Sequence, residues 1–328
     1  MKAAYAKGGA GIDQIEIREV AEPSPGPGEA VVRLKAATLN FRDLQFVTGR
    51  LKGMTKEPEY VPLSCAAGEV VSVAEGVTRV KSGDRVSPLF AQGWFEGPPT
   101  MTHLGGPVDG VARTMAAFDA ESLVAVPDEL GDLEAATLPC AGLTAWSALF
   151  GARPLQRGEW VLAQGTGGVS LAALQWAKAA GANVVITSSS DAKLHRAKAL
   201  GADVGINYRT NADWASAVRS ALGGKGVDIV IDTVGADEVG PAASLLNEGG
   251  IIAAIGNLAG DFSWSQQDVP FVPISVGNRQ GHEAMTAFAA EHRIRPVVDV
   301  VYDLDRVDDA LRHMQSGDFF GKIGVNLL

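Results

Sequence analysis

A glycine-rich turn between an apolar run and an Ala-rich segment has the residue types and spacing of a phosphate-binding loop. The apolar run begins at Trp160, the turn is Gln164-Gly-Thr-Gly-Gly-Val-Ser170, and a second apolar run spans residues 183–187. A strand–turn–helix–strand unit of this kind directs backbone N–H groups and the positive end of a helix dipole at a pyrophosphate. Gly165 allows the tight turn, and Gly167 allows the backbone to approach the phosphates. We therefore predict a dinucleotide-binding site.

The residues after the second apolar run bear on which dinucleotide is bound. A protein that prefers NAD usually carries Asp or Glu there, which hydrogen-bonds the ribose 2′-hydroxyl. This chain has Ser188 and Ser189 instead, with Lys193 one helical turn further on. Hydroxyl groups and an ammonium attract a 2′-phosphate that a carboxylate repels, so the sequence favours NADPH over NADH. The alternative is that Ser190 only caps a helix and Lys193 is a solvated surface charge.

Charge, length and cysteine content limit the class of protein. The 328 residues include 28 Lys and Arg and 38 Asp and Glu, a formal net charge of −10. Such a charge repels nucleic acid and anionic membranes. We find no secretory signal and no apolar run long enough to span a bilayer. The two cysteines, Cys65 and Cys140, are too few for a disulfide framework. We expect a two-domain cytoplasmic protein with a small-molecule substrate.

Two different patterns follow one another along the chain. Up to about residue 125, short alternating stretches between Gly and Pro turns predict a twisted antiparallel barrel. From Leu133 onward, buried strands alternate with helices, which predicts a doubly wound parallel sheet. The strands predicted after the glycine-rich unit are residues 204–208, 227–231, 251–255 and 273–276, and the helices are residues 134–150, 190–200, 213–222, 238–246 and 279–291. The segment from residue 297 returns to the first pattern, so we expect it to rejoin the first domain.

Several further motifs resemble those of the medium-chain dehydrogenase/reductase superfamily. They are Pro139-Cys-Ala-Gly-Leu-Thr-Ala145, Asn207-Tyr-Arg209, Asp232-Thr-Val-Gly235, Ile255-Gly-Asn257 and Phe320-Gly-Lys322, and Leu39-Asn-Phe-Arg-Asp43 resembles the zinc-free quinone oxidoreductase branch. The resemblance covers nearly the whole chain. It implies a GroES-like, mostly antiparallel β-barrel catalytic domain (residues 1–124 and 294–328) and a Rossmann NADPH-binding domain with a doubly wound parallel sheet (residues 125–293). It also implies a homodimer formed through residues 273–276.

The resemblance allows zinc to be tested residue by residue. In the alcohol dehydrogenases of this superfamily, ligands of the catalytic zinc stand at the positions held here by Asn40, Ser64 and a residue near Cys140. Cys65 lies beside Ser64, but two thiols without a histidine make a poor catalytic zinc site. The cysteine cluster of the structural zinc lobe is also missing from the sequence. We predict no metal site.

Without a metal, the acceptor must be activated by geometry and hydrogen bonding. We predict that Asn40 donates a hydrogen bond to the acceptor or orients the nicotinamide, and that Arg42 and Asp43 either support it or form an ion pair that holds their loop. The cofactor contacts that the resemblance implies are Asn40, Thr144, Gly165, Thr166, Gly167, Gly168, Val169, Ser188, Ser189, Lys193, Tyr208, Val234, Ile255, Gly256, Asn257 and Arg279. Structural roles are the alternatives for Tyr208, as a core aromatic, and for Arg279, as a helix cap.

These features together predict an NADPH-dependent, zinc-independent reductase. Hydride leaves the nicotinamide for an electron-poor carbon, and a quinone or an enone delocalises the negative charge that then builds on its oxygen. An unactivated ketone normally needs zinc or a strong acid. The alternatives are an alcohol dehydrogenase-like enzyme acting on simple alcohols or aldehydes, and a non-catalytic NADPH-binding sensor.

Overall fold

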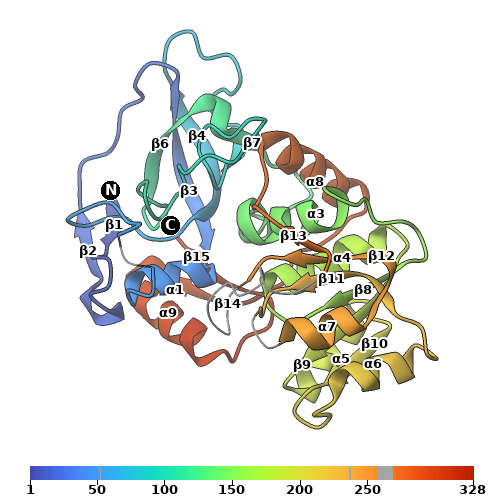
Figure 1. Ribbon diagram of the computed structural model, residues 1–328. Helices are drawn as coiled ribbons and strands as arrows, with labels where there is room; N and C mark the ends of the chain where they lie inside the picture. Colours follow the sequence, from blue (N-terminus) through green and yellow to red (C-terminus); the bar gives the residue numbers. More distant parts are fainter. Residues whose placement is uncertain (52, 236–237, 257–268) are drawn as a thin grey trace. The chain divides into compact units, whose positions relative to one another are not determined.

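The computed structural model describes residues 1–51, 53–235, 238–256 and 269–328. They form two units: residues 1–143 with 277–328 (unit 1), and residues 144–276 (unit 2). The chain therefore leaves unit 1 once and returns to it, as the two patterns in the sequence predicted. Figure 1 shows the elements of both units.

Unit 2 contains a parallel sheet with the strand order β10-β9-β8-β11-β12-β13. In chain order this is the 3-2-1-4-5-6 arrangement of a Rossmann fold, so the predicted doubly wound sheet is confirmed. The order reverses between β8 and β11, and the ligand of such a sheet binds at the carboxyl ends of these strands. The strands are β8 (Trp160–Ala163), β9 (Asn183–Ser188), β10 (Val204–Asn207), β11 (Val227–Asp232), β12 (Leu246–Ala254) and β13 (Phe271–Pro273).

The helices of unit 2 pack on this sheet, with α4 against β8 and β9, α5 and α6 against β10, and α7 against β12 (Figure 1). Two of them begin at side-chain caps that satisfy free N–H groups of the first turn. Ser190 Oγ accepts from Lys193 N (3.4 Å), and Asp213 Oδ1 accepts from Ser216 N (3.0 Å). The helices are α4 (Gly168–Ala179), α5 (Asp191–Ala199), α6 (Trp214–Ala221) and α7 (Val239–Ser244), and α3 (Leu143–Phe150) precedes them.

Unit 1 contains a larger sheet with the order β14-β15-β3-β4-β5-β7, and β6 also pairs with β3. Its pairs are antiparallel except for β14 with β15, which matches the mostly antiparallel domain that was predicted. A separate antiparallel pair joins β1 to β2. The strands are β1 (Lys2–Tyr5), β2 (Glu16–Glu19), β3 (Glu29–Thr38), β4 (Cys65–Val73), β5 (Arg85–Pro88), β6 (Met115–Asp119), β7 (Leu123–Ala125), β14 (Val298–Asp303) and β15 (Lys322–Asn326).

Helices α1 and α9 of unit 1 lie next to each other and bury apolar side chains in its core (Figure 1). On α9 the buried residues recur at helical spacing, as expected of an amphipathic surface helix. The sequence analysis did not predict α1. The helices are α1 (Phe41–Val47), α2 (Asp132–Ala135), α8 (Arg279–Glu291) and α9 (Val307–Ser316).

The helix predicted over residues 134–150 is interrupted in the structure. Helix α2 ends at Ala135, a π-helical turn covers Leu138–Gly142, and α3 follows. Pro139 lies inside this turn and has no N–H for a helical hydrogen bond, so a regular α-helix cannot pass through it. The π-helical turn carries Cys140, and such turns are frequent at functional sites.

The two units divide at different residues from the predicted domains. Residues 125–143 and 277–293 were expected in the Rossmann domain but belong to unit 1. These segments pack on unit 1, α2 against β3 and β4 and α8 against β7. Ion pairs also join them to it: Arg85 with Asp132 (2.7 Å), Arg79 with Glu283 (2.5 Å), and Arg279 with Glu121 (2.6 Å). Such long-range pairs cannot be identified from local sequence patterns.

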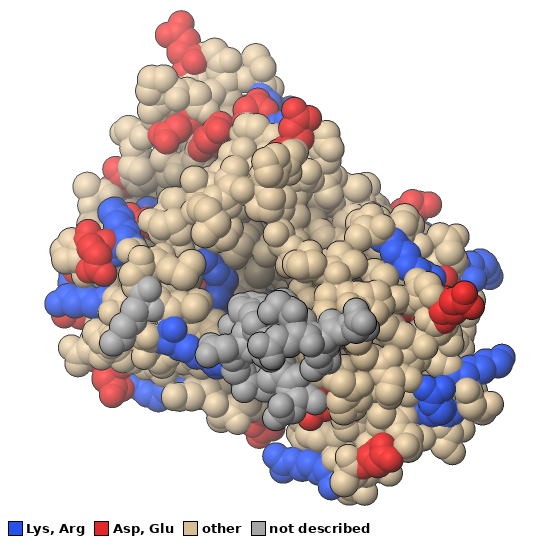
Figure 2. All heavy atoms as spheres, viewed as in Figure 1, with Lys and Arg blue, Asp and Glu red and all other residues tan. Residues whose placement is uncertain are grey.

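Two further observations concern the surface and the helices. Acidic and basic side chains are interspersed on the face shown in Figure 2. None of the described helices is both long and apolar enough to cross a bilayer.

Candidate active site

Strand register in unit 1 brings residue 40 opposite residue 322. In the β15–β3 pair, Gly324 lies opposite Thr38, and Leu39 N donates to Ile323 O (3.0 Å). Continuing this antiparallel register by two residues places Lys322 opposite Asn40. On the other side of β3, Thr38 lies opposite Cys65 at the start of β4. The ends of three strands thus meet around Asn40.

The side-chain amide of Asn40 is buried and has protein partners on both of its polar atoms. Its Oδ1 accepts from Lys322 Nζ (2.6 Å), and its Nδ2 donates to Ser64 Oγ (3.0 Å) and Cys65 Sγ (3.0 Å). Lys322 Nζ also donates to the Leu39 carbonyl. Lys322 is only 5% exposed, so a cationic side chain lies almost completely inside unit 1. Both N–H groups of the Asn40 side chain are therefore used within the protein. A donation from Asn40 to an acceptor stays a prediction, and it requires that one of these two bonds be given up.

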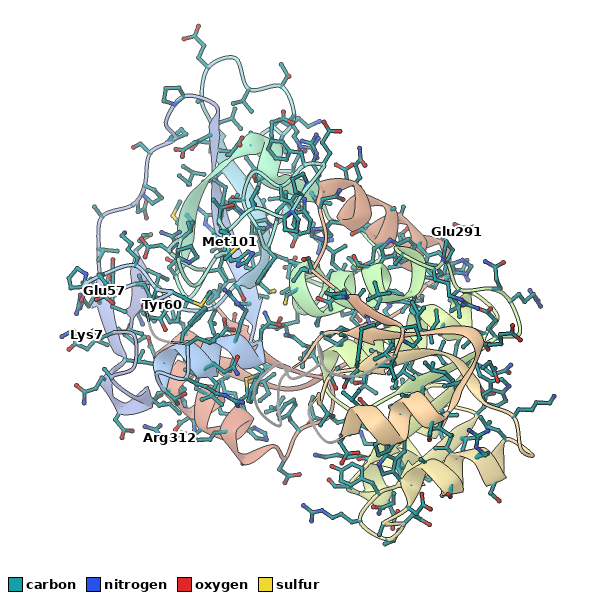
Figure 3. All side chains as sticks on the ribbon, viewed as in Figure 1. Lys7, Glu57, Tyr60, Met101, Glu291 and Arg312 are labelled. Carbon is teal, nitrogen blue, oxygen red and sulfur yellow. The ribbon has the colours of Figure 1, made fainter. Side chains whose placement is uncertain are left out.

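The buried carboxylate of Asp43 completes this series of hydrogen bonds. Ser64 Oγ donates to Asp43 Oδ1 (3.3 Å), and Asp43 Oδ2 accepts from the backbone N–H of Asn40 (2.7 Å). Burial raises the pKa of Asp43, whereas the neighbouring Arg42 guanidinium and the N–H of Asn40 act in the opposite direction. Tyr60, labelled in Figure 3, is also buried close to this carboxylate, and its hydroxyl has no hydrogen-bond partner among the described residues.

Cys65 and Cys140 interact with each other beside Asn40. Burial raises the pKa of Cys65, but the hydrogen bond with Cys140, the Lys322 ammonium and the Asn40 amide outweigh it, and the net shift is downward. The pKa of Cys140 is raised well above its usual value by its hydrogen bond with Cys65 and by burial. The sequence analysis considered these cysteines only as zinc ligands.

Arg42 and Asp43 do not form a hydrogen bond with each other. The alternative that an ion pair between them holds their loop is therefore wrong. The Arg42 guanidinium donates to the carbonyls of Leu104 (2.8 Å) and Gly106 (3.3 Å). It also stacks over the rings of Phe46 (4.6 Å) and Phe90 (4.8 Å). Arg42 thus connects α1 to the segment near residue 105. Asp43 instead belongs to the series of hydrogen bonds that begins at Lys322.

The residues around Asn40 do not fit a zinc ion. Within the described ranges, no group of three or more His, Cys, Asp or Glu side chains could hold a metal. Asn40 and Ser64 are neutral ligands, and the Lys322 ammonium, 2.6 Å from Asn40 Oδ1, would repel a divalent cation. Lys322 was quoted in the sequence analysis only as part of a motif; a lysine at the start of an apolar strand is the signal that could have identified it.

The glycine-rich turn of unit 2 has open space where a ligand was predicted. Gly165 has a φ of +78°, which favours glycine. A Cβ added at Gly167, directly before α4, would meet no atom within 4 Å. Ser170, which replaces the third glycine of the fingerprint, is buried and donates its hydroxyl to Gln164 O (2.6 Å). Close packing of the helix on the turn is therefore kept. Thr166, Gly168 and Val169 complete the turn and the first residues of α4.

The loops after β11 and β12 approach each other closely near three predicted cofactor contacts. Asp232 Oδ1 accepts from Val234 N (3.0 Å), and Asp232 O accepts from Ile255 N (2.9 Å). A Cβ at Gly256 would come within 1.9 Å of Thr233 O, so only glycine fits there. The predicted contact Asn257 lies outside the described residues.

The residues predicted to select the 2′-phosphate gather at the end of β9. Ser188 is buried and its Oγ accepts from Ser190 N (3.3 Å), whereas Ser189 and Lys193 are partly exposed. Ser190 caps α5, as the alternative had it. The sequence analysis missed Asp191, whose carboxylate accepts from Asn207 Nδ2 (2.8 Å) in the same region.

Three other predicted contacts have distinct surroundings. Tyr208 is 43% exposed, so its alternative role as a core aromatic is wrong. Thr144 is buried in the first turn of α3. Arg279 donates to Glu121 (2.6 Å) and stacks over Phe95 (4.5 Å). The N-cap of α8 is Asn278, so Arg279 is not the helix cap.

Comparison with known proteins found two family models that match consecutive parts of the chain. The alcohol dehydrogenase GroES-like domain matches residues 26–128, and the zinc-binding dehydrogenase model matches residues 168–302. A zinc-type alcohol dehydrogenase-like protein of Schizosaccharomyces pombe is 38% identical, over 97% of this chain and 96% of its own length. Acryloyl-coenzyme A reductase of Metallosphaera sedula is 31% identical, over 94% of this chain and 95% of its own length.

Two solved structures are similar to this chain over 99% of its length. An NAD-dependent alcohol dehydrogenase has a TM-score of 0.90 at 30% identity, with 99% of that chain covered. The mycobacterial protein Rv1454c, complexed with NADPH, has a TM-score of 0.81 at 26% identity, with the whole of that chain covered.

Proposed function

Because the chain belongs to the medium-chain dehydrogenase/reductase superfamily, we propose that it transfers a hydride from NADPH to a quinone, an enone or a similarly activated carbonyl, without zinc. Unit 2 holds the cofactor in this proposal. Unit 1 provides the groups that act on the acceptor.

Cofactor binding is assigned to the carboxyl ends of the strands of unit 2. The turn formed by Gly165, Thr166, Gly167, Gly168 and Val169 binds the pyrophosphate at the start of α4. The N–H of Gly165 itself donates to Thr187 Oγ1 (3.3 Å). The open space at Gly167 supports this role. The proposed contacts of the nicotinamide half are Val234, Ile255, Gly256 and Asn257. Thr144 faces the pyrophosphate or the nicotinamide, Arg279 contacts the cofactor, and Tyr208 stacks near the adenosine.

NADPH is proposed over NADH on the basis of the residues at the end of β9. Ser189 and Lys193 offer a hydroxyl and an ammonium at partly exposed positions, and both suit a phosphate. A carboxylate in this region, that of Asp191, would favour NADH because it repels a 2′-phosphate. This carboxylate, however, already accepts a hydrogen bond from Asn207. The solved relatives include one complexed with NADPH and one described as NAD-dependent, so the choice depends on these side chains.

The observation that carries the proposed acceptor class is the buried Lys322 ammonium against Asn40. Neutral hydrogen-bonding groups beside a fixed ammonium lack the Lewis acidity by which zinc activates a simple alcohol or ketone. An enone or a quinone needs less assistance because conjugation spreads the charge that arrives with the hydride. The acryloyl-coenzyme A reductase among the relatives acts on an activated double bond by its name, which supports the same class.

The test is the initial rate of NADPH oxidation by EDTA-treated protein with quinones, enones and simple aldehydes, and with NADH in parallel. We expect turnover of quinones or enones, a preference for NADPH, and no gain when zinc is added back. Turnover of simple aldehydes that depends on added zinc would overturn the proposal in favour of an alcohol dehydrogenase, the activity that the name of the S. pombe relative suggests. NADPH binding without turnover of any acceptor would instead support a sensor.

We also propose a homodimer formed through the edge of the unit 2 sheet. β13 pairs with β12 on one side, and in the described part of the chain it has no strand on the other. An unpaired edge strand is a template for pairing with a second copy. Light scattering of the purified protein tests this: a monomeric mass would contradict it.

A further inference from the structure

The Lys322 ammonium determines which way the Asn40 amide points. A lysine ammonium can only donate hydrogen bonds, and an amide has one end that accepts and one that donates. Lys322 Nζ lies 2.6 Å from one end of the Asn40 amide, so that end must be the oxygen. The amide N–H groups must then point toward Ser64 Oγ and Cys65 Sγ, each 3.0 Å away.

The direction of the hydrogen bond at the other end of this series, between Ser64 and Asp43, is determined as well. Ser64 Oγ receives a hydrogen from Asn40 and gives its own to Asp43 Oδ1 at 3.3 Å. An ionised carboxylate can only accept. The donors therefore run in one direction, from Lys322 through Asn40 and Ser64 to Asp43, with an obligate donor at one end and an obligate acceptor at the other.

The charges at these ends balance each other inside unit 1. Lys322 is 5% exposed and Asp43 is 1% exposed, and a buried charge is tolerated when it is paired and hydrogen-bonded. The ammonium stands among the residues that occupy zinc-ligand positions in alcohol dehydrogenases of the superfamily.

We propose that Lys322 is a positioning residue that fixes the orientation of the Asn40 amide and supplies the fixed positive charge of the acceptor site, in place of a metal ion. The expected effect of Lys322 on turnover rests on the proposed function. Its expected effect on neighbouring groups of the protein does not depend on turnover. Cys65 Sγ, which receives an N–H of Asn40, is the group on which that effect can be observed.

The first experiment compares Lys322→Met, which has neither the charge nor the donors, with Lys322→Arg, which has both. We expect Lys322→Met to lower kcat about 100-fold, because a misdirected group in an active site costs about that much, and to leave the KM for NADPH unchanged. Lys322→Arg should recover most of the loss. Lys35→Met is the control, because Lys35 lies on β3 and pairs with Glu69 near the surface. A kcat for Lys322→Met equal to that of Lys35→Met would overturn the proposal.

The second experiment measures the ultraviolet absorbance of the thiolate at Cys65 as a function of pH, with Cys65→Ala as the blank. Lys322→Met should move the midpoint upward by about one pH unit, because it removes a nearby positive charge, and Lys322→Arg should not. An unchanged midpoint would contradict the inference even if no acceptor is ever turned over. A shifted midpoint with no turnover of any acceptor would keep the inference about Asn40 and reject the proposed function.

A variant that keeps an ion pair at this position covers the case in which Lys322→Met does not fold. Asn40→Asp can still accept from Lys322 but has no N–H for Ser64 or Cys65. We expect it to fold, to lose kcat about 100-fold as well, and to raise the midpoint of the Cys65 titration. Activity and a midpoint equal to those of the parent protein would show that the orientation of Asn40 is irrelevant.

Discussion

In unit 2 the proposed cofactor contacts come mostly from one turn and from neighbouring strand ends, whereas in unit 1 the proposed acceptor site joins segments far apart in the chain. The turn of unit 2 uses backbone N–H groups and lies within residues 165–169. The chain of hydrogen bonds in unit 1 links residues 40, 43, 64 and 322. A backbone site needs only glycine and a helix N-terminus, but a side-chain site needs partners that the sheet brings together.

This difference predicts which kind of substitution damages which step. In unit 1, removal of a single side chain leaves buried polar partners without hydrogen bonds. In unit 2, a side chain added at Gly167 takes space from the proposed ligand without meeting a described atom, so the fold should stay intact. Activity and cofactor binding should therefore respond to different variants.

The largest effect is expected at Asn40. Asn40→Ala removes the acceptor of Lys322 Nζ and the donor to Ser64 and Cys65, so we expect kcat to fall at least 100-fold. NADPH affinity, measured by fluorescence titration, should stay within about twofold of the parent, a difference well below 1 kcal/mol. Asn326→Ala is the control, because that side chain lies on the same strand as Lys322, β15, and bonds to the exposed Asp303. Equal kcat in both variants would remove Asn40 from the proposed mechanism.

A smaller effect, on binding alone, is expected at Gly167. Gly167→Ala adds a methyl group to open space before α4, so the melting temperature should not fall. The KM for NADPH should rise about tenfold, because the backbone can no longer approach the phosphates as closely. Gly240→Ala, on α7 and also with open space, should leave this KM unchanged. If Gly167→Ala behaved in the same way, the phosphates would bind elsewhere.

The choice between NADPH and NADH is expected to depend on Lys193 to a lesser extent. Lys193→Met should lower the ratio of kcat/KM for NADPH over NADH about five- to tenfold, since an ion pair at a partly exposed position contributes roughly 1 kcal/mol. Asp191→Asn is the counterpart and should raise the ratio, because it removes a carboxylate near the end of β9. Ratios that do not respond to either substitution would reject these side chains as the selectors of the 2′-phosphate.

The smallest effect is a pH dependence of stability that arises in unit 1. Burial lowers the pKa of His282 to about 4, and burial followed by the Arg42 charge lowers that of His103 to about 4. Both pKa values lie below the ordinary histidine value of 6.5. Between pH 4 and pH 6.5 the unfolded chain therefore binds more protons than the folded protein does. The stability is complete above pH 6.5 and is lost as the pH falls toward 4, by about 1 kcal/mol per pH unit for a fully buried histidine.

Urea denaturation of the parent and of His282→Gln at pH 7 and pH 5 checks this expectation. The variant should lose less stability between the two pH values than the parent does. His195→Gln, at an exposed position on α5 of unit 2, is the control and should behave as the parent. An identical pH dependence in all three proteins would mean that His282 does not contribute.

Much of unit 2 could be predicted from the sequence, because its elements are local. The strands predicted over residues 204–208, 227–231 and 251–255 and most helices are present, and the turn with Gly165 and Ser170 has the expected structure. The strand predicted over residues 273–276 is misplaced, because β13 covers Phe271–Pro273. The exception among the helices is the one over residues 134–150, which Pro139 interrupts. The division between the units was placed differently because it depends on contacts between residues distant in sequence, such as those of α2 with β4 and of α8 with β7.

The sequence by itself indicated the superfamily through the resemblance of its motifs. It also predicted the Rossmann sheet and the glycine-rich turn, because apolar periodicity and glycine spacing are properties of neighbouring residues. The tertiary structure alone decided the partners of Asn40. The pairing of β15 with β3 brings Lys322 to it across more than 280 residues of chain, and no local pattern records which strands become neighbours. The same pairing places a buried ammonium next to Asn40 and near the two cysteines, in the acceptor site that we propose.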